Sequence, residues 1–192
     1  LLTLIGPPGI GKTRLSIRAA ETLLDDFPDG VWFVDLAPVT DPMLVSAIIA
    51  RQVGVHDLAD TPLVQQVRAV LRDQRVLLVL DNCEQVAAAA PAIGELLRGC
   101  KGLKVLATSR VPLHLYGEHE YALPPLSTPP DGTPVDQLTA YEAIALFLAR
   151  VRQHQPAFAI DGANAGHLRE ILRKLQGIPL AIELAAATLR RM

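Results

Sequence analysis

The first residues able to do chemistry lie near the start of the chain, in a Gly- and Pro-rich stretch. The pattern GxxxxGK[ST] is matched there by Gly6, Pro7, Pro8, Gly9, Ile10, Gly11, Lys12 and Thr13. Glycines let the backbone aim several N–H groups at phosphate oxygens, and the N-terminus of a following helix adds partial positive charge. We expect Lys12 to neutralise the charge of the β- and γ-phosphates of a bound nucleotide, ATP or, with its β-phosphate alone, ADP, and the Thr13 hydroxyl to ligate Mg²⁺. Arg14, the next residue, is a further nucleotide-binding candidate.

A second candidate group ends an apolar run. Asp81 directly follows VLLVL at residues 76–80. A carboxylate at the carboxyl end of a central strand sits beside bound phosphates and holds Mg²⁺ through a water. An apolar run ending in Asp is common by itself. The prediction of a Mg²⁺ site therefore depends on its place after the phosphate loop in an α/β pattern. We expect Asp81 to share the Mg²⁺ with Thr13.

Hydrolysis also needs a group that orients the attacking water, and here the sequence leaves alternatives open. Many related ATPases place a second acid after the strand-terminal Asp, but this chain has Asn82, which cannot take a proton. Glu84, the nearest carboxylate, is either the catalytic base or a cap of the following helix. Arg110 directly follows the run VLATS at residues 105–109. It either contacts the γ-phosphate and distinguishes ATP from ADP, or is a solvated surface residue.

Apolar runs and turn residues predict alternating strands and helices over the first 123 residues. The expected strands cover residues 1–5, 31–36, 76–80, 104–108 and 119–123. The expected helices cover residues 12–26, 41–53, 61–73 and 84–98. Two of them open on Asp41-Pro42 and Thr61-Pro62, which suit an N-cap and a first helical residue. The alternation predicts a mostly parallel α/β sheet covered on both faces.

The pattern changes after residue 123. A connector at 124–135 contains five prolines, and only helices are expected beyond it, at 136–152, 163–175 and 179–191. Gly177 suits the C′ position after one helix and Pro179 the first position of the next. We therefore expect an α/β core at 1–123, a Pro-rich connector at 124–135 and a small helical subdomain at 136–192.

Composition limits the partners. The net charge is −2, which gives no electrostatic reason to expect nucleic acid or an anionic membrane as a direct partner. Cys83 and Cys100 fit buried reduced thiols, so we expect a cytoplasmic location. No apolar run reaches the roughly 18–20 residues that span a bilayer. The chain starts without Met and runs straight into a motif, which is typical of a piece of a longer protein.

Taken together and in this order, GPPGIGKT, VLLVLDNCE, VLATSR and GIPLAIELAA resemble the STAND class of signal-transduction ATPases. The likeness is closest to the NB-ARC-like domain of bacterial AfsR- and LuxR-type regulators, and it covers essentially the whole chain. The resemblance implies an ASCE-type P-loop NTPase sheet of order 5-1-4-3-2, followed by a helical lid over the nucleotide. It also implies phosphate contacts from Gly6 to Thr13, a sensor-1 role for Arg110, and packing of Pro179 and Leu180 on the adenine.

The chain also departs from the pattern of the family that it resembles. Family members carry a further helix and adenine-pocket segment ahead of the loop, and a winged-helix domain after the lid. Neither is present here, so we expect reduced nucleotide affinity of the isolated piece. The five histidines, at positions 56, 114, 119, 154 and 167, match no catalytic position of the family.

The resulting hypothesis is a regulatory NTPase switch. ATP binding closes the lid, slow hydrolysis resets it, and fused effector and sensor domains read the state, with transcription as the expected output. Nucleotide-dependent self-association is a further expectation. Two alternatives stay open: an AAA+-like motor ATPase, which would use a second acid after Asp81 and an arginine finger in trans, and a non-hydrolysing scaffold with ADP as a structural ligand.

Overall fold

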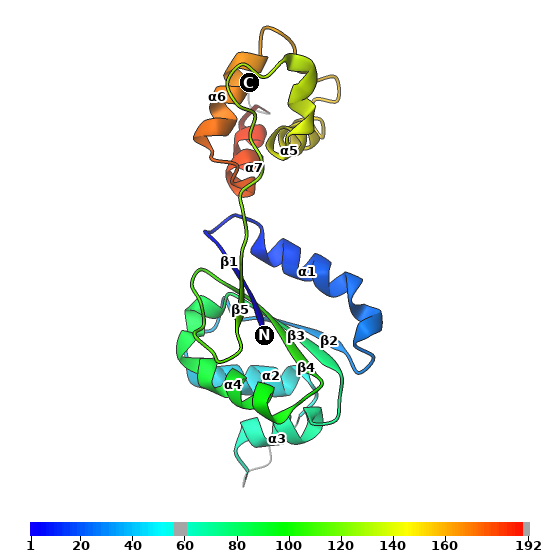
Figure 1. Ribbon diagram of the computed structural model, residues 1–192, viewed down its shortest axis with the longest axis vertical. Helices are drawn as coiled ribbons and strands as arrows, with labels where there is room; N and C mark the ends of the chain where they lie inside the picture. Colours follow the sequence, from blue (N-terminus) through cyan, green and yellow to red (C-terminus); the bar gives the residue numbers. More distant parts are fainter. Residues whose placement is uncertain (56–60, 190–192) are drawn as a thin grey trace. The chain divides into compact units, whose positions relative to one another are not determined.

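The computed structural model describes residues 1–55 and 61–189, which form two compact units. The first unit consists of Leu1–Pro7 and Lys12–Leu123. The second consists of Pro8–Gly11 and the chain from Pro124 onward. The first unit is an α/β sheet structure and the second is a group of helices (Figure 1).

A five-stranded parallel sheet forms the centre of the first unit (Figure 1). Its strands are β1 (Leu2–Ile5), β2 (Val31–Asp35), β3 (Val76–Asp81), β4 (Leu103–Ser109) and β5 (His119–Ala122). They lie in the order β2-β3-β4-β1-β5, and each neighbouring pair is parallel. Read from the other edge, this is the predicted order 5-1-4-3-2, so the predicted fold class is confirmed.

The interior strand β3, between β2 and β4, is buried along its whole length, because helices cover both faces of the sheet. Val76, Leu78 and Leu80 pack in a core shared with residues of three helices, and Leu77 and Val79 pack on the opposite face. The helices are α1 (Lys12–Thr22), α2 (Val45–Gln52), α3 (Leu63–Leu71) and α4 (Ala90–Gly99). Figure 1 shows α1 on one side of the sheet and the other three on the opposite side. Burial on both faces explains the unbroken apolar run of β3.

Parallel strands bring their carboxyl ends to one edge of the sheet, and this edge collects the candidate site. β1 leads into the phosphate loop, β3 ends at Asp81 and β4 ends at Ser109. The register pairs Ile5 with Ser109, so the phosphate loop and Arg110 follow neighbouring strands. Segments far apart in the sequence therefore meet at this edge.

The prediction of a continuous helix over 84–98 is wrong in its first half. Cys83–Ala89 forms short 3₁₀ turns with a kink at Val86 (φ −131°, ψ 37°), and α4 begins only at Ala90. Pro91 explains the break, because a proline lacks an N–H and is tolerated only in the first turn of a helix. The helix therefore starts one residue before it.

Two other helices of this unit are shorter than expected. The helix predicted over 12–26 ends at Thr22, and a 3₁₀ turn follows at Leu24–Asp26. The one predicted over 41–53 opens with a 3₁₀ turn at Pro42–Leu44 before α2. Its predicted cap is confirmed, because the Asp41 side chain accepts the Met43 N–H at 2.9 Å.

The cap predicted at Thr61 is wrong by one residue. Pro62 is the N-cap of α3, with extended backbone (φ −54°, ψ 131°) and no side-chain cap. Its carbonyl accepts the N–H groups of Gln65 and Gln66, which open the helix. A proline at this position cannot offer the hydroxyl that caps a helix, so α3 begins at Leu63 without one.

Three helices form the second unit, α5 (Glu142–Val151), α6 (Ala165–Lys174) and α7 (Pro179–Thr188). Their common core includes four fully buried side chains, Leu138, Ile144, Leu172 and Ile182. Arg150 of α5 contacts Glu183 of α7 at 2.7 Å. The helix predicted over 136–152 is wrong in one respect: a 3₁₀ segment at Val135–Ala140 is separated from α5 by the extended Tyr141 (φ −89°, ψ 133°).

The turn between α6 and α7 differs slightly from the prediction. Gln176 follows the C-cap Leu175 with a φ of 52°, and Gly177 comes next with a φ of 68°. The C′ position predicted for Gly177 is therefore occupied by Gln176. Glycine is still required, since a Cβ at Gly177 would collide with the carbonyl oxygen of Leu126. Pro179 is the first residue of α7, as predicted.

Candidate nucleotide-binding site

The predicted phosphate loop connects β1 to α1 through backbone conformations that suit glycine. Gly9 and Gly11 have φ values of 77° and 101°, a region that side chains disfavour. Helix α1 begins at Lys12, directly after the loop, so its first-turn N–H groups have no carbonyl partner within the helix. A loop and helix N-terminus of this kind bind anionic oxygens.

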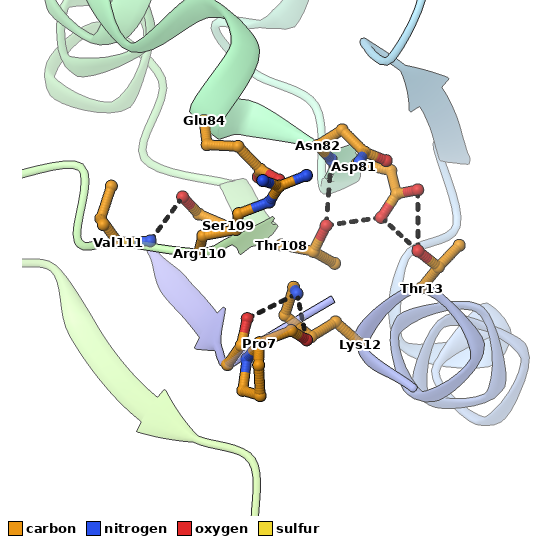
Figure 2. A network of polar contacts seen from close by, with 11 residues as sticks. Pro7, Lys12, Thr13, Asp81, Asn82, Glu84, Thr108, Ser109, Arg110 and Val111 are labelled. Carbon is orange, nitrogen blue, oxygen red and sulfur yellow. Dashed lines mark hydrogen bonds and ion pairs between the residues drawn. The ribbon is translucent and has the colours of Figure 1, made fainter. Parts of the chain in front are cut away.

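The Lys12 ammonium lies over the start of this loop (Figure 2). Its Nζ donates to the carbonyl oxygens of Gly6 at 2.7 Å and Pro7 at 3.2 Å. Burial lowers the pKa of Lys12; attraction to Glu84 and Asp81 opposes the shift and repulsion from Arg110 adds to it. Among the described residues the two hydrogen bonds of this ammonium go to neutral carbonyls, so a partly desolvated cation is well suited to take a phosphate oxygen instead.

Next to the ammonium, two hydroxyls fix the Asp81 carboxylate (Figure 2). The Thr13 Oγ1 lies 2.9 Å from each carboxylate oxygen of Asp81 and donates to that carboxylate. The Thr108 hydroxyl, from β4, donates to Asp81 Oδ1 through a short hydrogen bond. Thr13 and Asp81 together present the hard oxygen ligands that Mg²⁺ prefers, so this donor set fits the predicted metal.

Asn82 stands where many related ATPases have a second acid, and its backbone is unusual. Its φ is 62°, in the left-handed region that Asn tolerates better than most residues. Its N–H donates to the Thr108 Oγ1 at 3.0 Å, which ties the end of β3 to β4. Asn82 thus shapes the turn after Asp81 but offers no group that takes a proton.

Glu84 and Arg110 form an ion pair beside this turn (Figure 2). Arg110 Nε lies 2.9 Å from Glu84 Oε1; the Glu84 side chain is 12% exposed and that of Arg110 54% exposed. The second oxygen, Glu84 Oε2, is buried and has no hydrogen-bond partner among the described residues. Glu84 therefore uses its carboxylate on Arg110 rather than as a helix cap. Arg110, in turn, is not simply solvated, because it is held at the site edge.

The remaining candidates divide between the two units. Arg14 is exposed on the first turn of α1, whereas the Ile10 side chain is buried at 4% exposure and so serves packing. Within the second unit, Leu180 N–H donates to the carbonyl of Gly9 at 3.2 Å, and a Cβ on Gly9 would stand only 2.8 Å from the Leu180 Cβ. The segment Pro8–Gly11 thus lies against the start of α7, where Pro179 and Leu180 are found.

Sequence reasoning missed one residue of this arrangement. Thr108 bridges Asp81 and Asn82, yet it carries no motif signature of its own. The available signal was its position: a hydroxyl at the carboxyl end of the strand that neighbours β3. Strand neighbours are a property of the fold, so the signal gains meaning only once the sheet order is known.

Outside this site, the described residues offer little other chemistry. Cys83 and Cys100 are buried and free, as predicted. His56 lies outside the described residues, and across 1–55 and 61–189 no three His, Cys, Asp or Glu side chains are grouped to hold a metal. Over the same ranges, no helix has the length and apolar character to cross a membrane.

Comparisons with known proteins identify the family of the chain and its relatives. A family model described as an AAA domain matches residues 1–123. A Mycobacterium tuberculosis protein named as an HTH-type transcriptional regulator is 42% identical over 193 residues, covering 100% of this chain and 20% of that protein. The regulatory protein AfsR of Streptomyces coelicolor is 31% identical, covering 97% of this chain and 18% of AfsR. The chain thus spans about a fifth of the length of these relatives.

Two solved structures share the fold. A STAND protein with a tetratricopeptide repeat sensor from Pyrococcus horikoshii has a TM-score of 0.56 at 14% identity, covering 96% of this chain and 27% of that one. The ORC2 protein of Aeropyrum pernix, solved as ADPNP-ADP complexes, has a TM-score of 0.56 at 17% identity, covering 98% and 54%. The resemblance to STAND-like P-loop ATPase modules of AfsR-type regulators is confirmed. With its phosphate loop inside a family match that covers residues 1–123 of 192, the chain belongs to the AAA domain family of P-loop ATPases.

Proposed function

We propose that the chain is an ATP- and ADP-binding module that works as a nucleotide-controlled switch within a longer regulatory protein. The observation that carries this proposal is the grouping of Lys12, Thr13 and Asp81 at one edge of the sheet. A cation, a hydroxyl and a buried carboxylate stand at the end of a glycine loop, held by contacts of 2.7 to 3.2 Å. The names of the relatives, and the nucleotides in the Aeropyrum pernix structure, support it.

In this proposal each group has a separate task. The loop from Gly6 to Thr13 holds the phosphates, with Arg14 beside it, and Pro179 with Leu180 contacts the adenine. Thr13 and Asp81 hold Mg²⁺, which neutralises phosphate charge when it is bound. Thr108 keeps the Asp81 carboxylate in place, because its hydroxyl restricts rotation of that side chain.

A switch requires contacts that differ between the triphosphate and the diphosphate. Moving a population from 1:99 to 99:1 takes about 5.5 kcal/mol of differential binding. Hydrogen bonds to charged groups contribute roughly 1.5–3 kcal/mol each. Contacts of Lys12, Arg110 and Mg²⁺ with the γ-phosphate are therefore sufficient in number for a two-state response.

Hydrolysis in this proposal is slow. Asn82 cannot act as a base, and Glu84 is engaged by Arg110. The motor alternative is less well supported, because the second acid expected directly after Asp81 is missing. The scaffold alternative makes a separate prediction: ADP retained with negligible turnover.

The wider context is also part of the proposal. Residues 1–123 form the nucleotide-binding core, 124–135 a connector and 136–192 an NB-ARC-like lid. Fused domains sense the signal and act on transcription, while this segment makes no direct contact with DNA. Its location is cytoplasmic, and its triphosphate state self-associates.

The test is a titration of the 192-residue chain with fluorescent ADP and with MgATP. We expect saturable binding that Lys12→Ala weakens about 10- to 150-fold, the loss of one charge-assisted contact. Turnover should stay below about one per second, at the slow end for enzymes.

The matched control is Lys101→Ala, which removes an exposed lysine between α4 and β4. It should leave both affinities unchanged. Equal binding by the Lys12 and Lys101 variants, or no binding by the unaltered chain, would contradict the proposed function.

A further inference from the structure

We propose that Glu84 and Arg110 form a latch that the γ-phosphate opens, so that the base is released only in the triphosphate state. This inference rests on the proposed nucleotide function and adds a regulatory step to it. In the closed latch, Arg110 is held by Glu84. In the open latch, Arg110 contacts the γ-phosphate and both Glu84 oxygens are available to orient water.

The two partners differ in how firmly they are held. The Glu84 side chain is 12% exposed, so its position is set by the surrounding core. Arg110 is 54% exposed, so it can swing away through solvent with little loss of packing. The printed contact joins Arg110 Nε to Glu84 Oε1 at 2.9 Å, an ion pair at the edge of the site. Arg110 is therefore the moving part of the pair.

The topology places this pair next to the phosphate loop. Arg110 directly follows Ser109, which is paired in register with Ile5, the residue before Gly6. The charges of Glu84 and Arg110 both act on the Lys12 ammonium. A phosphate bound at Lys12 would therefore attract Arg110 and repel Glu84 at the same time. Added negative charge is the perturbation that opens this pair.

The second Glu84 oxygen, Oε2, connects the latch to hydrolysis, because it can hold a water molecule. Oε2 is buried and has no hydrogen-bond partner among residues 1–55 and 61–189. A buried carboxylate oxygen without a donor is costly, and a water held there would satisfy it. When Arg110 leaves, Oε1 also becomes available, so Glu84 can bind and orient a water molecule through either oxygen. Hydrolysis would then depend on the contact that senses the γ-phosphate.

The latch predicts a specific energetic coupling. Breaking the pair opposes binding of a triphosphate but has no effect on a diphosphate that leaves the latch closed. A partly exposed ion pair of this kind corresponds to about a 2- to 5-fold change in an equilibrium constant. Glu84→Gln should therefore favour MgADPNP over MgADP by about that factor, and Arg110→Ala should weaken MgADPNP selectively.

The experiment is a double-mutant cycle on the 192-residue chain, with MgADPNP and MgADP affinities measured by calorimetry. Glu84→Gln also removes a negative charge near the phosphates, so the decisive comparison is the same substitution in the Arg110→Ala background. We expect the ratio of the two affinities to change less there, because Arg110 is no longer available to be released. An equal change in both backgrounds would overturn the latch.

A matched control is the exposed ion pair Arg18–Glu21 on α1, with 2.8 Å between its partners. Glu21→Gln should leave the affinity ratio unchanged. Lys12→Ala separates the two proposals: if nucleotide binding requires Lys12 but the cycle is additive, only the latch fails. If binding is absent or does not require Lys12, the proposed function fails and the latch fails with it.

Discussion

Replacing Thr108 with valine tests the network around Asp81, because it removes one hydroxyl and keeps the branched shape of the side chain. Thr108 is 1% exposed; its hydroxyl donates to the Asp81 carboxylate and accepts the Asn82 N–H. Losing a hydrogen bond to a charged group costs roughly 1.5–3 kcal/mol. Leaving the half-buried Asn82 N–H unpaired adds about 1 kcal/mol, at the low end since water can reach it.

The extra apolar contact of valine offsets up to about 0.8 kcal/mol. The free energy of unfolding should therefore fall by about 2–3 kcal/mol. Trp32, the single tryptophan, lies in β2 of the same unit and reports its unfolding in urea. With a slope near 2 kcal/mol per molar urea, the midpoint should fall by about 1–1.5 M.

A matched control is present in the neighbouring strand. Thr3 of β1 is 0% exposed, and its hydroxyl, although near Glu118, makes no well-formed hydrogen bond among the described residues. Thr3→Val should change the free energy of unfolding by less than about 1 kcal/mol, since no strong bond is lost. If both valine variants lose the same stability, the reasoning about the Thr108 network is refuted.

Three further predictions concern other parts of the chain. Nucleotide affinity should fall as pH rises through the pKa of Lys12, because only the ammonium pairs with phosphate. Burial holds this pKa below its ordinary value of 10.5. Titrations of affinity from neutral to alkaline pH check this, and a flat profile would contradict it. Burial raises the pKa of the Cys83 thiol to about 12. A thiol reagent near neutral pH should therefore label Cys83 only after unfolding. Rapid labelling of Cys83 in the native chain would contradict its burial. Gly177→Ala should destabilise the second unit by more than about 1 kcal/mol, because its φ is 68° and a Cβ would meet the Leu126 carbonyl. Gly166→Ala in α6, with open space around it, should instead stabilise the unit by up to about 1 kcal/mol. Circular dichroism of the helices during thermal unfolding compares the two variants.

Much of the fold and part of the candidate site could be predicted from the sequence, because their signals are local. The glycine loop, the apolar run of β3 and the alternation of strands and helices each depend on residues a few positions apart. The sheet order followed from the resemblance rather than from periodicity. Where a local signal was overlooked, as with Pro91 inside an expected helix, the element boundary was wrong.

Contacts between distant segments were decided by the tertiary structure. Thr13 and Asp81 are 68 positions apart, and Asn82 and Thr108 are 26 apart. The sequence by itself determined which residues have the chemistry for phosphate and Mg²⁺, because a motif specifies side-chain types and spacing. Only the tertiary structure decided that Thr108 holds Asp81 and that Glu84 holds Arg110, because the parallel register alone brings the carboxyl ends of β3, β4 and β1 to one edge.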